Sequence, residues 1–402
     1  MYFTEKFSDS NKPAQEKFYK KKWFKIAGPI ILILIIGGCA MAFKTGLTLN
    51  KITGGGLLQS VIHNIPGVKN TLKGEEDGRI NILLLGMRGE NVPGGGLLAD
   101  TIMVASILPQ ENKVALISIP RDLYVNNPGW ANKSKINAVY AAGEEKERSK
   151  GLADMKQVVG DITGLPIYYA SSINFKGFSD LVNTLGGIEI TLKESFSEPL
   201  QFNEPHPCDS NVFTKPTGKY ETKEVVTSRK LDGRKSYKTE TFSTCTNPDI
   251  ECGGNFSLPA GTQTLDGETA LCYVRSRTTS SDFERAKRQQ IVIQKIREKG
   301  LSIGTLSDFS KISGMLNSLG DNVRTDMQIW EIQKLFDIYR EMNNPQVFQR
   351  VLENSGEEFL YSPKESNGAG YILLPIGDNY DKIREMAENI FTLPAQSDIE
   401  PK

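Results

Sequence analysis

The chain has 402 residues, and its 48 Lys and Arg residues balance 48 Asp and Glu residues, so the formal net charge is zero. This balance argues against a protein that binds nucleic acid through bulk positive charge. The chain has only two histidines, His63 and His206, and both fall outside the predicted core, which argues against a Ser-His-Asp triad or a histidine metal centre there.

An apolar run near the N-terminus predicts a membrane anchor. Residues 26–43 contain no charged side chain, and as a helix they would span about 27 Å, close to the hydrocarbon thickness of a bilayer. Five lysines lie between positions 17 and 25, whereas only Lys44 follows closely. This excess predicts a cytoplasmic tail over residues 1–25 and a cell-membrane protein whose remainder is extracellular. A cleaved signal peptide is the alternative, although its apolar region is usually shorter.

Beyond the predicted transmembrane helix, residues 44–76 are rich in Gly and Lys and are interpreted as a juxtamembrane linker. Residues 77–395 are long enough to bury a sizeable core as an extracellular domain. A polar, poorly periodic insertion interrupts this domain at about residues 195–257, and residues 396–402 form a tail.

Short apolar runs predict strands over residues 80–86, 100–108 and 114–119, joined as a meander with polar residues at its ends. Helices are predicted over 154–162 and 175–185, the second of which ends at Gly186-Gly187. A strand over 188–192 follows, then a long helix over 285–299, further helices as far as Phe391, and a strand over 371–375 before the last helix. This succession predicts an α/β fold.

Five cysteines are distributed unevenly along the chain. Cys39 lies in the apolar run, three lie in the insertion, and Cys272 lies in a predicted strand. An extracellular location favours disulfides. Three insertion cysteines cannot all pair with one another, so one is free or joins Cys272. A zinc site is the alternative, with the ligands His206, Cys208, Cys245 and Cys252.

Four arginines lie close together after the insertion. Residues 271–277 form an apolar, strand-like run in which Arg275 and Arg277 share one face. Arg285 and Gln289 share one face of the predicted helix that follows. Permanently charged guanidinium groups in such an arrangement suit a phosphate-rich ligand. The alternative is a basic rim that forms surface salt bridges.

Several segments, all in one order along the chain, carry a family resemblance. Over about residues 77–389, the chain resembles the LytR-CpsA-Psr family of membrane-anchored cell-wall ligases, which implies a central mixed β-sheet flanked by helices. The matching segments are Ile82–Gly86, Asp100–Val104, Ser118–Asp122, Lys135–Tyr140, Phe175–Phe178, Leu185–Ile188, Leu265–Leu271, Tyr273–Arg277, Asp282–Arg285 and Arg288–Gln290.

The resemblance implies a phosphotransferase that moves a glycopolymer from a polyprenyl diphosphate carrier to a peptidoglycan hydroxyl, typically the 6-hydroxyl of N-acetylmuramic acid, and forms a phosphodiester. Its partners would be the lipid-linked glycan, the glycan acceptor and the membrane. One alternative is a non-catalytic protein that binds polyprenyl phosphate or envelope glycan. Another is a membrane signalling protein or transcription attenuator, but a cytoplasmic tail of about 25 residues leaves no room for a DNA-binding domain.

The resemblance also implies roles for individual residues. It places Asp100 where the family binds Mg²⁺, and it assigns the pyrophosphate contacts to Arg121, Arg275, Arg277, Arg285 and Gln289. Such a site fits phosphoryl transfer, in which positioning and charge neutralisation supply most of the catalysis.

Two positions depart from the family pattern. Arg88 stands where a second metal-binding aspartate is usual, and Ala99 stands where an arginine is usual. Either Glu90 substitutes for the missing carboxylate, or Arg88 replaces the charge of the metal.

Four further residues have two interpretations each. Asp122 is a second metal ligand or a base, or it anchors Arg121. Asp282 is a base or a helix N-cap. Lys135 and Asn137 line the site or brace the loop that carries them.

Overall fold

The computed structural model describes residues 70–393 except 90–95, 148–149, 200–205, 209–214, 230–234, 247–254, 277–279, 303–318, 343, 355–358 and 365–368. The chain divides into two units, residues 1–48 and 49–402, and every described residue belongs to the second. The predicted cytoplasmic tail, transmembrane helix, most of the linker and the C-terminal tail lie outside the described residues, so the domain boundaries stay predictions. No helix of the described part is long and apolar enough to cross a membrane.

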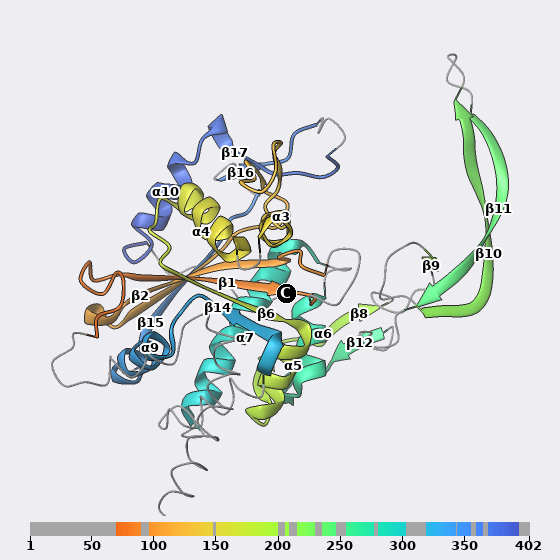
Figure 1. Ribbon diagram of the computed structural model, residues 1–402. Coiled ribbons are helices and arrows are strands. Elements are labelled where there is room, and N and C mark those ends of the chain that lie inside the picture. The colour runs from red at the N-terminus through yellow and green to blue at the C-terminus, as the bar shows by residue number, and fades with distance from the viewer. Residues whose placement is uncertain are drawn as a thin grey trace, which may run out of the picture. The chain divides into compact units, whose positions relative to one another are not determined.

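A mixed six-stranded sheet forms the centre of the described part, in the order β14-β6-β1-β2-β3-β15 (Figure 1). The predicted antiparallel meander is confirmed as β1 (Ile80–Met87), β2 (Thr101–Leu108) and β3 (Lys113–Ser118). On one side, β6 (Tyr169–Asn174) runs parallel to β1, and β14 (Val323–Thr325) runs antiparallel to β6. On the other side, β15 (Gln346–Val351) runs parallel to β3. Sequence reasoning missed β6, β14 and β15.

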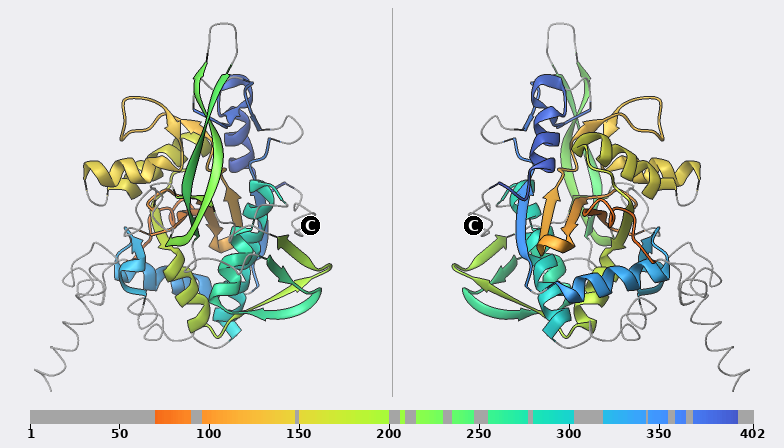
Figure 2. Two further views of the ribbon diagram at one scale, coloured as in Figure 1. Left: turned by 90° about the vertical axis from the view of Figure 1, so that its right-hand side faces the viewer. Right: turned by 90° about the vertical axis from the view of Figure 1, so that its left-hand side faces the viewer.

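Helices cover both faces of this sheet. Leu83 and Leu85 of β1 pack in a cluster with α3 (Ala138–Lys146), α4 (Lys150–Thr163) and α10 (Asp381–Glu388). Ile80 and Ile82, which alternate with them, pack in a cluster with α9 (Ile329–Glu341). In Figures 1 and 2, α4 and α10 lie above the sheet and α9 lies below it. Burial on both faces explains why these strands are continuous apolar runs rather than alternating ones.

A third apolar cluster contains residues of α5 (Phe175–Thr184), α6 (Gly267–Arg275) and α7 (Asp282–Ser302). Two antiparallel strand pairs complete it, β7 (Ile188–Leu192) with β13 (Gly261–Leu265) and β8 (Phe196–Pro199) with β12 (Asn255–Leu258). Smaller elements elsewhere are β4 (Tyr124–Val125), β5 (Ser134–Lys135), β16 (Leu360–Tyr361), β17 (Leu374–Pro375), and the 3₁₀ turns Pro109–Glu111, Gly320–Asn322 and Ile376–Asp378.

The strand predicted for residues 271–277 is wrong, because Gly267–Arg275 forms helix α6. The helix begins at Asp266, whose carboxylate Oδ1 accepts a hydrogen bond from the Thr269 backbone N–H at 2.8 Å. The buried residues Ala270, Tyr273 and Val274 follow the i, i+3, i+4 spacing of a helix rather than the alternation of a strand. Cys272 therefore lies on a helix, and Arg275 ends it. Arg277 lies outside the described residues.

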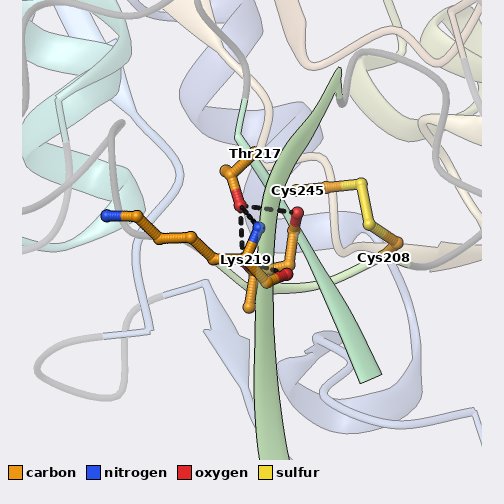
Figure 3. Close-up of a disulfide and its surroundings, with 5 residues drawn as sticks. Cys208, Thr217, Lys219 and Cys245 are labelled. Atoms are coloured by element: carbon orange, nitrogen blue, oxygen red, sulfur yellow. Dashed lines mark hydrogen bonds between the residues drawn. A yellow bond between two sulfur atoms is a disulfide. The ribbon is translucent and has the colours of Figure 1, made fainter. Parts of the chain in front are cut away.

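The insertion contains a long hairpin, β10 (Lys215–Arg229) with β11 (Lys235–Thr246), which β9 (His206–Pro207) extends. A disulfide joins Cys208 to Cys245 (Figure 3). Beside it, the Thr217 hydroxyl donates to the Thr244 carbonyl at 2.9 Å. The predicted disulfide chemistry is confirmed, and it excludes zinc coordination by these two thiols. Cys272 is also disulfide-bonded, while Cys252 lies outside the described residues.

Gln290 joins α7 to the central sheet. Its side-chain amide is fully buried and donates to the Ser118 hydroxyl at 2.8 Å and to the Arg350 carbonyl at 3.0 Å. Ser118 ends β3 and Arg350 belongs to the paired strand β15, so a single side chain connects three elements.

We expect Gln290→Ala to lower the free energy of unfolding by about 2–4 kcal/mol, because it leaves buried acceptors without a donor and opens a cavity. Chemical denaturation of the purified protein measures the change. The matched control is Gln157→Ala on the exposed side of α4, which should change stability by less than about 0.5 kcal/mol. Equal stability of the two variants would contradict the role given to Gln290.

Candidate functional site

The meander brings three sequence-distant residues to one edge of the sheet. Gly86, near the end of β1, pairs with Thr101 at the start of β2, and Ser118 at the end of β3 pairs with Met103. Arg88 follows the end of β1, Asp100 immediately precedes β2, and Arg121 follows the end of β3. Strand β6 ends at the same edge, where Asn174 pairs with Met87, and α5 begins there at Phe175.

Asp100 lies between two guanidinium groups at this edge. Its Oδ1 accepts from Arg121 Nη1 at 2.9 Å, and its Oδ2 lies 3.9 Å from Arg88 Nε. Arg88, the departure from the family pattern, therefore points its charge at the carboxylate implied as the metal ligand. Ala99, the other departure, is fully buried, and its N–H donates to the Asn137 carbonyl at 3.0 Å.

Arg121 contacts three carboxylates. Besides Asp100, its Nε lies 3.2 Å from Asp282 Oδ2 and 3.6 Å from Asp122 Oδ2. Burial alone would lower the pKa of Arg121, but the negative charges of Asp100, Asp282 and Asp122 outweigh burial and raise it. The guanidinium is therefore a fixed cation at any physiological pH.

Asp282 and Asp122 each hold a second cation. Asp282 is the first residue of α7, and its Oδ1 lies 3.3 Å from Arg285 Nη1 one turn later. Asp122 Oδ1 lies 2.6 Å from Lys135 Nζ. The geometry thus includes the anchoring role of Asp122, and the base roles of Asp122 and Asp282 stay predictions.

Asn137 braces the same loops through its backbone. Its N–H donates to the Arg121 carbonyl at 3.3 Å while its own carbonyl accepts from Ala99. It therefore connects the segment after β3 to the segment before β2, which carry Arg121 and Asp100.

Arg275 is half-buried at the end of α6, with its guanidinium carbon 4.6 Å from the centre of the Phe175 ring. Burial and the positive charges of Arg88 and Arg285 lower the pKa of Arg275 to about 10, against the opposing effect of Asp100. The charges of Arg88 and Arg285 are therefore close enough to act on Arg275. An anion bound beside Arg275 would offset their effect, which is a property of a site suited to a polyanion.

Gln289 and Arg285 lie on helix α7, as predicted. The Gln289 side-chain amide donates to the Val274 carbonyl at 3.3 Å, in the last turn of α6. Gln289 therefore connects α7 to the turn that carries Arg275. Its contact with pyrophosphate stays a prediction.

Sequence analysis counted Arg288 among the clustered arginines but gave it no role, and it is the largest fully buried side chain among the described residues. Its guanidinium donates to the Tyr273 carbonyl at 3.2 Å, to the Ser276 carbonyl and to the Ser280 hydroxyl at 3.0 Å. It also lies 5.1 Å from the centre of the Phe196 ring, in β8 of the insertion. Arg288 therefore fixes the end of α6 against α7 and positions Arg275 relative to Arg285. The only signal in the sequence was its spacing of i+3 from Arg285.

The described residues do not fit a magnesium site. Mg²⁺ requires near-octahedral oxygen ligation, but both oxygens of Asp100 face guanidinium groups, and Asp122 and Asp282 are ion-paired. Across the described part of the chain, no group of three or more His, Cys, Asp or Glu side chains could hold a metal. Glu90, the alternative ligand, lies outside the described residues.

A cavity of about 450 Å³ adjoins Arg121. It lies beside the Arg88, Arg275 and Arg285 cluster rather than within it, and it shares Arg121, Asp122, Lys135 and Asp282 with the contacts above. The lining residues are Pro120, Arg121, Asp122, Lys135, Ser281, Asp282, Phe283, Tyr371 and Leu373.

A family model for LytR-CpsA-Psr proteins matches residues 59–367. The chain belongs to this family. The resemblance that the sequence motifs indicated is thereby confirmed, and the mixed sheet flanked by helices is the fold that it implied.

Curated relatives within the family are cell-wall transferases by name. The chain is 26% identical over 331 residues to the polyisoprenyl-teichoic acid–peptidoglycan teichoic acid transferase TagU of Enterococcus faecalis, covering 80% of this chain and 84% of that protein. It is 24% identical over 336 residues to TagT of Bacillus subtilis, covering 82% and 85%. The crystal structure of gbs0355 from Streptococcus agalactiae matches with a TM-score of 0.53 at 21% identity, over 82% of this chain and 93% of that one. This structural match shows the fold alone.

We expect Arg88→Asp to create a magnesium site, because it replaces a repelling cation with a second carboxylate beside Asp100. Isothermal titration calorimetry should show Mg²⁺ binding at least about tenfold tighter than in the wild type, equivalent to about 1.4 kcal/mol. Arg88→Ala separates the new ligand from the loss of positive charge. Equally tight Mg²⁺ binding by wild type and Arg88→Asp would show that the described carboxylates are not the limiting ligands.

We expect Arg275→Met to raise the melting temperature by about 1–3 °C. The pKa of Arg275 is lowered in the folded protein, so its charged form is disfavoured by folding at every pH below about 10. Removing the cation relieves that cost at neutral pH, and the gain should begin to shrink only above pH 10, toward the ordinary pKa of arginine. Thermal melts at pH 7 and pH 11 measure the difference. Lys133→Met, at an exposed position, is the control, and a loss of stability in Arg275→Met at pH 7 would contradict the argument.

Proposed function

We propose that this protein is a phosphotransferase that moves a glycopolymer from a polyprenyl diphosphate carrier to a peptidoglycan hydroxyl and forms a phosphodiester. The observation that carries the proposal is the gathering of Arg88, Arg121, Arg275 and Arg285 around Asp100 and Asp282 at one edge of the sheet. A diphosphate is the kind of ligand that such a cluster neutralises. The family membership and the names of the relatives support the same reaction.

In the proposed reaction, the acceptor hydroxyl oxygen attacks the phosphorus that carries the sugar. A new P–O bond forms to the acceptor, the P–O bond to the bridging oxygen breaks, and polyprenyl phosphate leaves. The hydroxyl proton passes to Asp122 or Asp282, which both lie beside Arg121 and line the cavity. The arginines stabilise the charge on the transferring and leaving groups, which is the main requirement of phosphoryl transfer.

The reaction is proposed to take place on the outer face of the cell membrane, with the N-terminus in the cytoplasm and a single transmembrane helix over residues 26–43. The disulfide between Cys208 and Cys245 supports an extracellular location for the domain, because disulfides persist in oxidising compartments.

A second candidate is a non-catalytic protein that binds the same lipid diphosphate or an envelope glycan. The Arg88–Asp100 contact favours it, because a cation stands where the family usually holds a metal ligand. The two functions predict the same binding and differ only in turnover.

We expect Arg275→Ala to weaken binding of a polyprenyl diphosphate-linked glycan by about ten- to a hundredfold, because one charge-assisted contact is lost. Arg277→Ala should behave alike if the family role of Arg277 holds. Native mass spectrometry of detergent-purified protein measures the bound lipid. Arg340→Ala, on the exposed side of α9, is the control for removing an arginine elsewhere.

Incubation with lipid-linked glycan and peptidoglycan oligomers then separates the two functions. A phosphodiester-linked product supports the transferase. Tight binding of both substrates without product would sink the transferase and leave the binding protein.

A further inference from the structure

The cavity beside Arg121 has a wall that comes from the C-terminal segment. The Leu373 N–H donates to the Asp122 carbonyl at 3.0 Å, and the Leu373 carbonyl accepts from the Tyr124 N–H at 2.9 Å. Leu373 itself is almost completely buried. The wall is therefore bonded directly to the loop that presents Arg121 and Asp122 and is held in register with them.

Tyr371 is the aromatic residue of this wall, and 52% of its surface is exposed. Its hydroxyl accepts a hydrogen bond from the Asn354 side-chain amide at 3.3 Å, which holds the ring in place. Burial, and then the negative charges of Asp122 and Asp282, raise the pKa of Tyr371. The phenol therefore stays neutral while it faces the two carboxylates proposed as proton acceptors.

The lining chemistry suits a sugar ring. Tyr371 and Phe283 offer aromatic surface on which the apolar C–H face of a pyranose can pack. Asp122, Asp282 and Lys135 offer acceptors and a donor for its hydroxyl groups. A volume of about 450 Å³ falls in the range of small-molecule sites.

Neither the polyprenyl tail nor the diphosphate of the lipid-linked donor suits this cavity as well as a sugar does. A polyprenyl tail requires an apolar channel, whereas most of the lining side chains carry charges or hydroxyl groups, at Arg121, Asp122, Lys135, Ser281, Asp282 and Tyr371. The diphosphate is better served by the neighbouring cations Arg88, Arg275 and Arg285, which do not line the cavity. The remaining candidate for this cavity is the acceptor sugar, whose hydroxyl must reach the phosphorus from beside Arg121.

We propose that this cavity binds the acceptor sugar and that Tyr371 is a specificity-determining residue for it. The proposal rests on the transferase function proposed above. Tyr371 supplies an exposed aromatic face to the cavity, and the shape of that face would select among acceptor glycans.

The test uses the full-length protein in detergent, with a lipid-linked donor at saturating concentration and a disaccharide of N-acetylglucosamine and N-acetylmuramic acid as the acceptor. Tyr371→Ala should raise the acceptor KM about tenfold and leave kcat and donor binding within about twofold. Tyr371→Phe, which keeps the ring, should stay within about threefold of the wild type. Tyr361→Ala, at another partly exposed tyrosine outside the cavity, should have no effect.

An unchanged acceptor KM in Tyr371→Ala would overturn the inference, and so would an equal loss of donor binding. Titration of the same disaccharide by saturation-transfer NMR separates this outcome from failure of the proposed function. If the wild type transfers nothing yet binds the disaccharide through Tyr371, the sugar site stands and the transferase does not. If the wild type transfers glycan and Tyr371→Ala does so equally well, the transferase stands and the sugar site is overturned.

Discussion

The arrangement of this site depends on one guanidinium group. Arg121 reaches Asp100 before β2, Asp122 beside it in the chain, and Asp282 at the start of α7. These carboxylates come from three parts of the sequence, and without the central cation their negative charges would repel one another. The pairings keep the start of α7 against the edge of the sheet, and Arg285 is placed by the same helix. The ion pairs of Arg121 therefore set the geometry in which Arg88, Arg275 and Arg285 are held.

Two kinds of arginine share the site. Arg121 pairs with carboxylates and Arg288 donates to the Tyr273 and Ser276 carbonyls, so both serve to position other groups. Burial and the positive charges of Arg88 and Arg285 lower the pKa of Arg275 to about 10, and a bound anion would offset both effects.

Much of the fold and of the candidate site could be predicted from the sequence, because these parts depend on residues that are close together in the chain. The meander of β1 to β3 follows from apolar runs of strand length, and Asp100 and Arg121 lie at strand ends whose pairing was predictable. The strands β14 and β15 were missed because each depends on a distant partner, and β14 has only three residues. Residues 271–277 were assigned a strand because an apolar run of that length suits either element, and the cap at Asp266 decided the outcome. The burial of Arg288 could not be predicted, because nothing near it in the chain distinguishes a buried cation from a solvated one.

The hairpin of the insertion has a further consequence for the behaviour of the protein in solution. It does not join the central sheet, and a strand of twelve residues extends for about 40 Å. Open strand edges of that length are templates for pairing with another chain. The exposed surface of this ribbon carries Glu224, Lys238 and several threonines, together with the exposed rings of Tyr220 and Tyr237. The charges along its strands oppose edge-to-edge association with another chain.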